Sequence, residues 1–140
     1  MENLWQLKKE EINSPIKILG YQASCLEELT EGYVRAEIIE RQSNNEELSY
    51  NFIIGSRYMP SYSFQLFYIV FPVVMYPIKF VVPQEIAQEL NIMVTNTLFG
   101  VVCENEEEFK VQLKRVLNTN YANKVINGIR SIVRTKVEDE

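Results

Sequence analysis

The stretch from Phe64 to Val82, FQLFYIVFPVVMYPIKFVV, decides the fold. On either side of Pro72, β-branched and aromatic residues occupy both alternating sets of positions. Such runs are typical of strands that are buried on both faces. We therefore predict two paired strands here, covered on both sides either by helices or by another subunit. Because Pro77 lacks a backbone N–H, the second strand is predicted to lie at an edge of the sheet near that residue.

The same region could be mistaken for a membrane span, since residues 58–78 carry no charged side chain. A spanning helix needs about 20 predominantly apolar residues. Three prolines (Pro60, Pro72 and Pro77) interrupt the stretch, and aromatic and β-branched residues are in surplus. These features favour strands over a helix, so we predict no membrane association.

Two further strands precede this pair. Apolar and polar residues alternate over 34–39 and again over 48–54, and the polar loop 42–47 between them has the length of a hairpin connection. Four consecutive strands with short connections predict an antiparallel meander. Residues 97–103, TLFGVVC, are the candidate for a fifth strand.

Helices are predicted on both sides of the strands. Ser14 followed by Pro15 is a favourable helix start, and Gly32 is a natural stop. Shorter helices are expected at 4–12 and 83–90, and two amphipathic helices follow Asn105, separated near 118–120. The expected fold class is α+β, a four- to five-stranded antiparallel meander packed against N-terminal and C-terminal helices. Its length predicts a single domain over residues 1–140.

The composition removes most catalytic chemistry. The 140 residues include no His, two Cys and a single Asp. Without His there is no base for a Ser–His or Cys–His nucleophile, and no ligand set for zinc. The five glycines match no phosphate-binding loop, and the glutamate clusters fit solvated helix ends and loops. We therefore predict that the protein is not an enzyme and uses neither a metal nor a cofactor.

Charge is distributed unevenly along the chain. The net charge is −5, yet residues 109–136 contain seven basic residues and no acidic ones. The acidic body argues against nucleic-acid binding by the whole domain. The basic segment has two interpretations. Its basic residues could bind an anionic partner, or they could simply be the solvated faces of two amphipathic helices. The candidate residues for an anionic partner are Lys110, Lys114, Arg115, Lys124, Arg130 and Arg134.

Two surfaces are candidates for binding another protein. The loop GSRYMPSY at 55–62 is longer than a tight turn needs and holds residue types that are enriched at interfaces, although its aromatic residues could equally cap the sheet end. The aromatic sheet is the second surface, and we predict self-association through it, as a homodimer. The candidate partner-binding residues are Arg57, Tyr58, Met59, Tyr62, Phe67 and Ile69.

The compartment is inferred from the two cysteines and the N-terminus. Cys25 and Cys103 lie far apart in apolar surroundings, which is typical of free buried thiols in a reducing cytosol, although a disulfide between them stays open at this point. The first residues, MENLWQLKKEE, do not resemble a secretory signal. We expect a cytoplasmic location.

Together these observations favour a small bacterial-type protein that binds another protein and does no catalysis, such as an antitoxin, an immunity protein, an inhibitor or a chaperone. The layout of helix, meander and helix is similar to that of small acidic secretion chaperones that dimerise. Two alternatives remain. One is a nucleic-acid-associated protein that uses the basic C-terminal helices, and the other is a module that binds a small ligand between sheet and helices.

Overall fold

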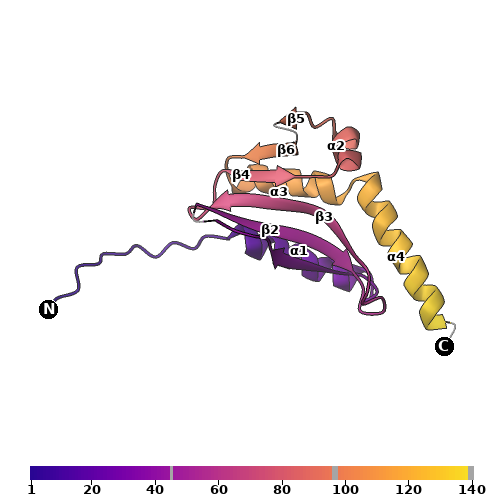
Figure 1. Ribbon diagram of the computed structural model, residues 1–140. Helices are drawn as coiled ribbons and strands as arrows, with labels where there is room; N and C mark the ends of the chain where they lie inside the picture. The colour runs from indigo at the N-terminus through magenta and orange to yellow at the C-terminus, as the bar shows by residue number, and fades with distance from the viewer. Residues whose placement is uncertain (45, 96–97, 139–140) are drawn as a thin grey trace.

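A computed structural model describes residues 1–44, 46–95 and 98–138, which form one antiparallel sheet packed against helices (Figure 1). The strands lie in the order β1-β2-β3-β4-β6-β5. This confirms the predicted α+β class, with a meander between N-terminal and C-terminal helices. The elements are α1 (Pro15–Leu29), β1 (Arg35–Glu40), β2 (Glu47–Gly55), β3 (Ser63–Pro72), β4 (Ile78–Val81), α2 (Gln84–Leu90), β5 (Val94–Thr95), β6 (Leu98–Cys103), α3 (Glu106–Leu117) and α4 (Asn120–Glu138).

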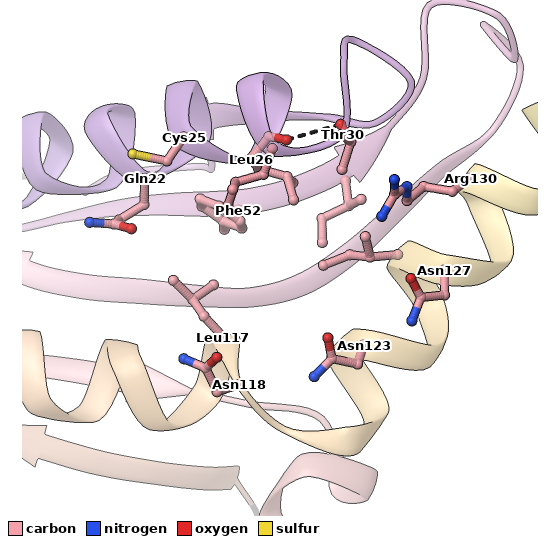
Figure 2. A pocket seen from close by; sticks show the side chains of 13 residues that line it. Gln22, Cys25, Leu26, Thr30, Phe52, Leu117, Asn118, Asn123, Asn127 and Arg130 are labelled. Carbon is pink, nitrogen blue, oxygen red and sulfur yellow. Dashed lines mark hydrogen bonds between the residues drawn. The ribbon is translucent and has the colours of Figure 1, made fainter.

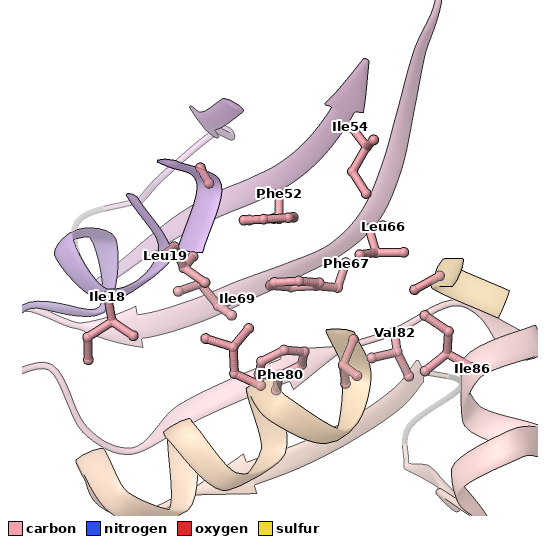
Figure 3. Close-up of a cluster of buried hydrophobic side chains, with 14 of the residues drawn as sticks. Ile18, Leu19, Phe52, Ile54, Leu66, Phe67, Ile69, Phe80, Val82 and Ile86 are labelled. Carbon is pink, nitrogen blue, oxygen red and sulfur yellow. The ribbon is translucent and has the colours of Figure 1, made fainter. Parts of the chain in front are cut away.

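Four phenylalanine rings form the centre of the core. Phe52 on β2 stacks on Phe67 of β3 at 4.9 Å between ring centroids, and Phe67 stacks on Phe80 of β4 at 4.5 Å. Phe80 then meets Phe109 of α3 at 5.8 Å. Ile18 and Leu19 of α1 belong to the same buried cluster as this row of rings (Figure 3). The row therefore joins three neighbouring strands to the helices on one face of the sheet.

A β-bulge in β3 interrupts the alternation expected from the sequence. Phe52 pairs with Phe67, but the next residue, Ile53, pairs with Gln65, so Leu66 has no partner. Leu66 and Phe67 are consecutive in the chain, and both are fully buried. An extra residue on one strand of a pair produces this effect, because it resets which side chains face the core.

The bulge bears on a prediction made from the sequence. Phe67 and Ile69 are 1% and 0% exposed, because they point into the monomer's own core. The prediction that these two residues contact a partner is therefore wrong. Their apolar character is explained by packing against α1 and α3.

The other face of the sheet remains partly open to solvent in the described part of the chain. Ile39 and Val102 are 42% and 52% exposed there. Tyr68 is half-buried, and the guanidinium of Arg41 lies 3.6 Å from its ring centroid. The cation–π contact and the surrounding polar side chains make this face less apolar than the sequence alone indicated.

Pro77 does not mark a sheet edge. The strand that follows it, β4, begins at Ile78 and lies between β3 and β6, so the edge prediction is wrong. The proline sits one residue outside the strand, where its missing N–H removes no bond from the ladder. The strand is also shorter than expected, because Pro72–Met75 forms a turn closed by the Met75 N–H donating to the Pro72 carbonyl.

The chain before α1 forms no helix, contrary to the prediction for 4–12. Residues 1–13 run away from the body without regular structure (Figure 1). A short helix gains little stability in water unless it packs against something, and this segment packs against nothing. Helix α1 starts as predicted, because the Ser14 side chain accepts a hydrogen bond from the Lys17 N–H at 3.1 Å. We call residues 1–13 the N-terminal arm.

We predict that Phe67→Ala lowers the free energy of unfolding by about 3–5 kcal/mol, because it removes the middle ring of the stack and leaves a cavity. Phe67→Leu keeps most of the volume and costs less. Urea unfolding followed by circular dichroism measures both. The control is Val102→Ala on the open face, which should change stability by no more than about 0.5 kcal/mol. Equal losses for Phe67→Ala and Val102→Ala would contradict the placement of Phe67.

Candidate functional site: a groove between the helices

Two neighbouring depressions lie between α1 and the C-terminal helices. One has a volume of about 300 Å³ and the other of about 330 Å³. They share three lining residues, Gln22, Leu117 and Asn118, so they form one continuous hollow. We call it the helical groove (Figure 2). It combines an apolar floor with polar walls, as sites for a ligand or a peptide commonly do.

The groove exists because α1 and α3 cover different parts of the same sheet face. α1 packs mainly on β1, and α3 packs on β6 at the other end of the sheet order. Between them the sheet side chains Phe52 and Ile54 form the floor. Both floor residues belong to the buried core, so the floor is rigid.

One face of each bordering helix lines the groove. From α1 come Gln22, Cys25, Leu26 and Leu29, and from α4 come Asn123, Ile126, Asn127 and Arg130. Both sets follow the spacing i, i+3, i+4, i+7, which places side chains on a single helix face. Each set combines apolar residues with carboxamides, so the walls offer both apolar contact and hydrogen-bonding groups.

Side chains distant in sequence fix the start of α4. Thr119 accepts a hydrogen bond from the Ala122 N–H at 3.1 Å, and its hydroxyl donates to the Val116 carbonyl. The Glu89 carboxylate of α2 accepts from the Asn120 N–H at 2.6 Å and from the Tyr121 N–H at 3.2 Å. A carboxylate at a helix N-terminus is stabilised by the unpaired N–H groups and the helix dipole. These bonds hold the α4 wall at its angle to α3.

The groove carries positive charge at both ends. Lys110 and Lys114 line the end near Ile18, and Arg130 lines the end near Thr30. Lys110 is paired with Glu106 at 3.0 Å. Arg130 makes no ion pair within the described residues, and its buried Nε has no hydrogen-bond partner. The lining residues include no carboxylate. An unpartnered guanidinium nitrogen favours an acceptor from outside the chain.

The predicted basic set divides into two parts. Lys110, Lys114 and Arg130 meet in the groove, as described above. Arg115 donates to the Leu90 carbonyl of α2 at 3.3 Å, so it joins two helices. Lys124 does not line the groove but borders a more open hollow next to it, which shares Asn123 and Asn127 with the groove, and Arg134 is exposed. The six basic residues of the predicted set therefore do not form one continuous stripe.

The predicted partner loop packs partly on its own chain. Arg57 donates a hydrogen bond to the Tyr58 hydroxyl at 2.8 Å, and Tyr58 meets Tyr33 edge-on at 5.8 Å. Tyr58 and Met59 are half-buried, whereas Arg57 and Tyr62 are exposed. The Tyr58 ring thus packs against Tyr33 of the same chain. Partner binding through this loop stays a prediction.

Sequence reasoning missed the carboxamides and Cys25. Gln22, Asn123 and Asn127 have the polarity of ordinary solvated helix positions, and only their spacing relative to Arg130 could have pointed to a shared face. The cysteines are free thiols in this structure. Cys25 lines the groove, whereas Cys103 is buried, and burial, with added repulsion from Glu108 and Glu104, raises its pKa to about 11.

The groove residues do not form a metal centre. Across the described ranges, no group of three or more His, Cys, Asp or Glu side chains is placed to hold a metal ion. Nor does any helix among these residues combine the length and apolar character needed to cross a membrane.

No protein-family model, curated protein or solved structure matches the chain. The groove chemistry is therefore the main guide to function.

The difference between the two thiols predicts their reactivity. At pH 8 a water-soluble aromatic disulfide reagent should modify one thiol per native chain, at Cys25, since the raised pKa keeps buried Cys103 protonated. Denaturant should expose the second thiol. Mass spectrometry after digestion locates the modification. The control, Cys25→Ser, should leave the native protein unreactive, and rapid labelling of that variant would contradict the burial of Cys103.

Proposed function

We propose that this protein is a cytoplasmic, non-catalytic protein-binding module that holds an acidic, amphipathic segment of another protein in the helical groove. The observation that carries the proposal is Arg130, whose guanidinium lies at the end of an apolar-floored groove without an ion pair in the described chain. A carboxylate from a bound segment supplies the missing acceptor. An antitoxin, an immunity protein, an inhibitor or a chaperone could each work in this way.

The groove suits a peptide for three reasons. Its floor and walls offer apolar contact through residues such as Phe52, Leu26 and Leu117. Its carboxamides can donate to and accept from a peptide backbone or polar side chain. Its length follows the axis of α1, and an amphipathic helix lying between helices is a common mode of peptide recognition. The free thiols fit the cytoplasmic part of the proposal.

The two alternatives find weaker support. Nucleic acid is normally bound by a continuous basic stripe, whereas here Arg115 is engaged with α2 and Lys124 lies outside the groove. The two depressions of the groove, of about 300 and 330 Å³, together have the volume of an ordinary ligand pocket, so size alone fits a small ligand as well. The elongated shape and the cations at both ends favour a chain-like anionic occupant.

The test uses a fluorescein-labelled peptide of Leu and Glu, about 16 residues long, whose Leu residues follow helical spacing. Fluorescence anisotropy should show binding of this peptide and none of its Leu/Lys counterpart. Arg130→Glu should weaken binding at least tenfold, about 1.4 kcal/mol, because a charge pair within the groove becomes a repulsion. Circular dichroism checks that the variant remains folded.

The matched control is Lys124→Glu, which makes the same charge change on the same helix outside the groove. It should alter the affinity less than twofold. If both variants weakened binding equally, general electrostatic attraction would explain the result and the groove would not be the site. A labelled oligo(dT) serves as the nucleic-acid probe, and salt-sensitive binding of it in preference to the peptide would favour the alternative function.

A further inference from the structure

We propose that the N-terminal arm of one copy of this chain docks into the helical groove of a second copy, so that the protein forms an arm-exchanged homodimer. The inference rests on the proposed function of the groove as a peptide site, and it names the occupant. Two independent observations support it: the arm exposes large apolar side chains that pack on nothing, and its carboxylates lie on both sides of the central ones, as the cations of the groove lie at both of its ends.

The arm exposes large apolar side chains that pack on nothing. Leu4, Trp5 and Leu7 are 81%, 77% and 80% exposed, and Ile12 is also exposed. Trp5 is the only tryptophan of the chain. A cluster of this kind is costly in water and is typical of a segment that orders on binding.

Carboxylates flank the central apolar residues of the arm. Glu2 precedes Leu4, Trp5 and Leu7, and Glu10 and Glu11 follow them after Lys8 and Lys9, so the arm carries three acidic and two basic side chains. The groove likewise has one cation at one end, Arg130, and two at the other, Lys110 and Lys114. Between them lies the apolar floor of Phe52 and Ile54.

The lengths are also compatible. The part of α1 that borders the groove, from Ile18 to Leu29, is about 17 Å long at helical rise. The eight-residue step from Glu2 to Glu10 covers about 12 Å as a helix and about 27 Å when extended. The arm can therefore place a carboxylate at each end of the groove without being fully helical or fully extended.

The direction of the arm favours a second copy over its own groove. It leaves α1 at the N-terminal end of that helix and runs away from the body of the molecule (Figure 1). Ser14 has an extended backbone, as expected of a residue before proline, and its side chain is committed to capping α1. The arm would have to reverse direction just before this fixed junction to enter its own groove, whereas a partner's groove requires no reversal.

The first experiment measures energy transfer from Trp5 to a dansyl group in mixed copies. The donor copy carries Cys25→Ser and keeps Trp5. The acceptor copy carries Trp5→Phe, Cys25→Ser and Ser24→Cys, with the dansyl group at position 24, which is exposed on α1 next in sequence to the groove-lining Cys25. Sensitised dansyl emission should appear on mixing, rise with concentration and fall when excess unlabelled acceptor copy is added. No transfer at any concentration would overturn the proposal.

The second experiment measures the oligomeric state by sedimentation velocity. The full chain should sediment as a dimer, and both the chain lacking residues 2–13 and Leu4→Glu/Leu7→Glu should sediment as monomers with an unchanged circular dichroism spectrum. The control, Lys8→Glu/Lys9→Glu, changes the arm's charge but leaves its apolar residues and carboxylates intact, and it should remain dimeric. A dimer that persists without the arm would overturn the proposal.

A third measurement separates this inference from the function on which it rests. Because arm and peptide compete, deletion of residues 2–13 should tighten binding of the Leu/Glu peptide at least threefold. If the peptide binds with unchanged affinity, the arm proposal fails while the groove function stands. If neither peptide nor arm enters the groove, both fail. Concentration-independent transfer within a single chain that carries both Trp5 and the position-24 dansyl group, if Leu4→Glu/Leu7→Glu abolishes it, would assign the arm to its own groove and overturn exchange.

Discussion

The arrangement of this protein depends on one row of stacked rings. Phe52, Phe67 and Phe80 come from three adjacent strands, and Phe109 continues the row into α3. Each contact joins elements that are separated in sequence, so the register of the strands and the position of a helix are coupled. The rest of the helical layer is placed relative to this row.

The helical groove is a consequence of that placement. With α3 held against the row through Phe109 and α1 held on β1, the two helices do not close over the sheet. The start of α4 is fixed separately, by Thr119 and by Glu89 of α2. The groove is thus bounded by elements with independent supports, which makes it a preformed site. Preformed sites lose less entropy on binding, because their walls are already ordered.

The sequence was most informative where a pattern was long and regular. The alternation of 48–54, the cap at Ser14 and the cap at Asn105 each predicted an element that the structure contains. The predictions failed where tertiary packing decides. No local signal marks the bulge at Leu66, and without it Phe67 and Ile69 read as candidates for an exposed apolar face. Pro77 was predicted at a sheet edge because it was expected to lie within the strand. It lies just outside β4, since the turn that precedes the strand ends later than the sequence pattern indicates.

The candidate site was only partly visible in the sequence. The basic segment indicated an anionic partner, and three of its six candidate residues lie in the groove. The other three could not be separated from them, because their roles depend on α2 and on the orientation of α4. The start and stop signals predicted the helix that became α1 but not which of its faces stays partly exposed. Its partial exposure follows from the separation between two helices, which no local pattern records.

The bulge at Leu66 has a consequence for how reliably β3 finds its place. It divides the strand into two halves whose side chains alternate in opposite phase. The outward residues of the second half, Tyr68 and Val70, are themselves apolar enough to be buried. A one-residue slip of pairing beyond the bulge would therefore exchange one acceptable apolar face for another. Hydrophobicity alone does not distinguish the two registers, so the correct one must be selected by shape, through the fit of Phe67 between its two neighbouring rings.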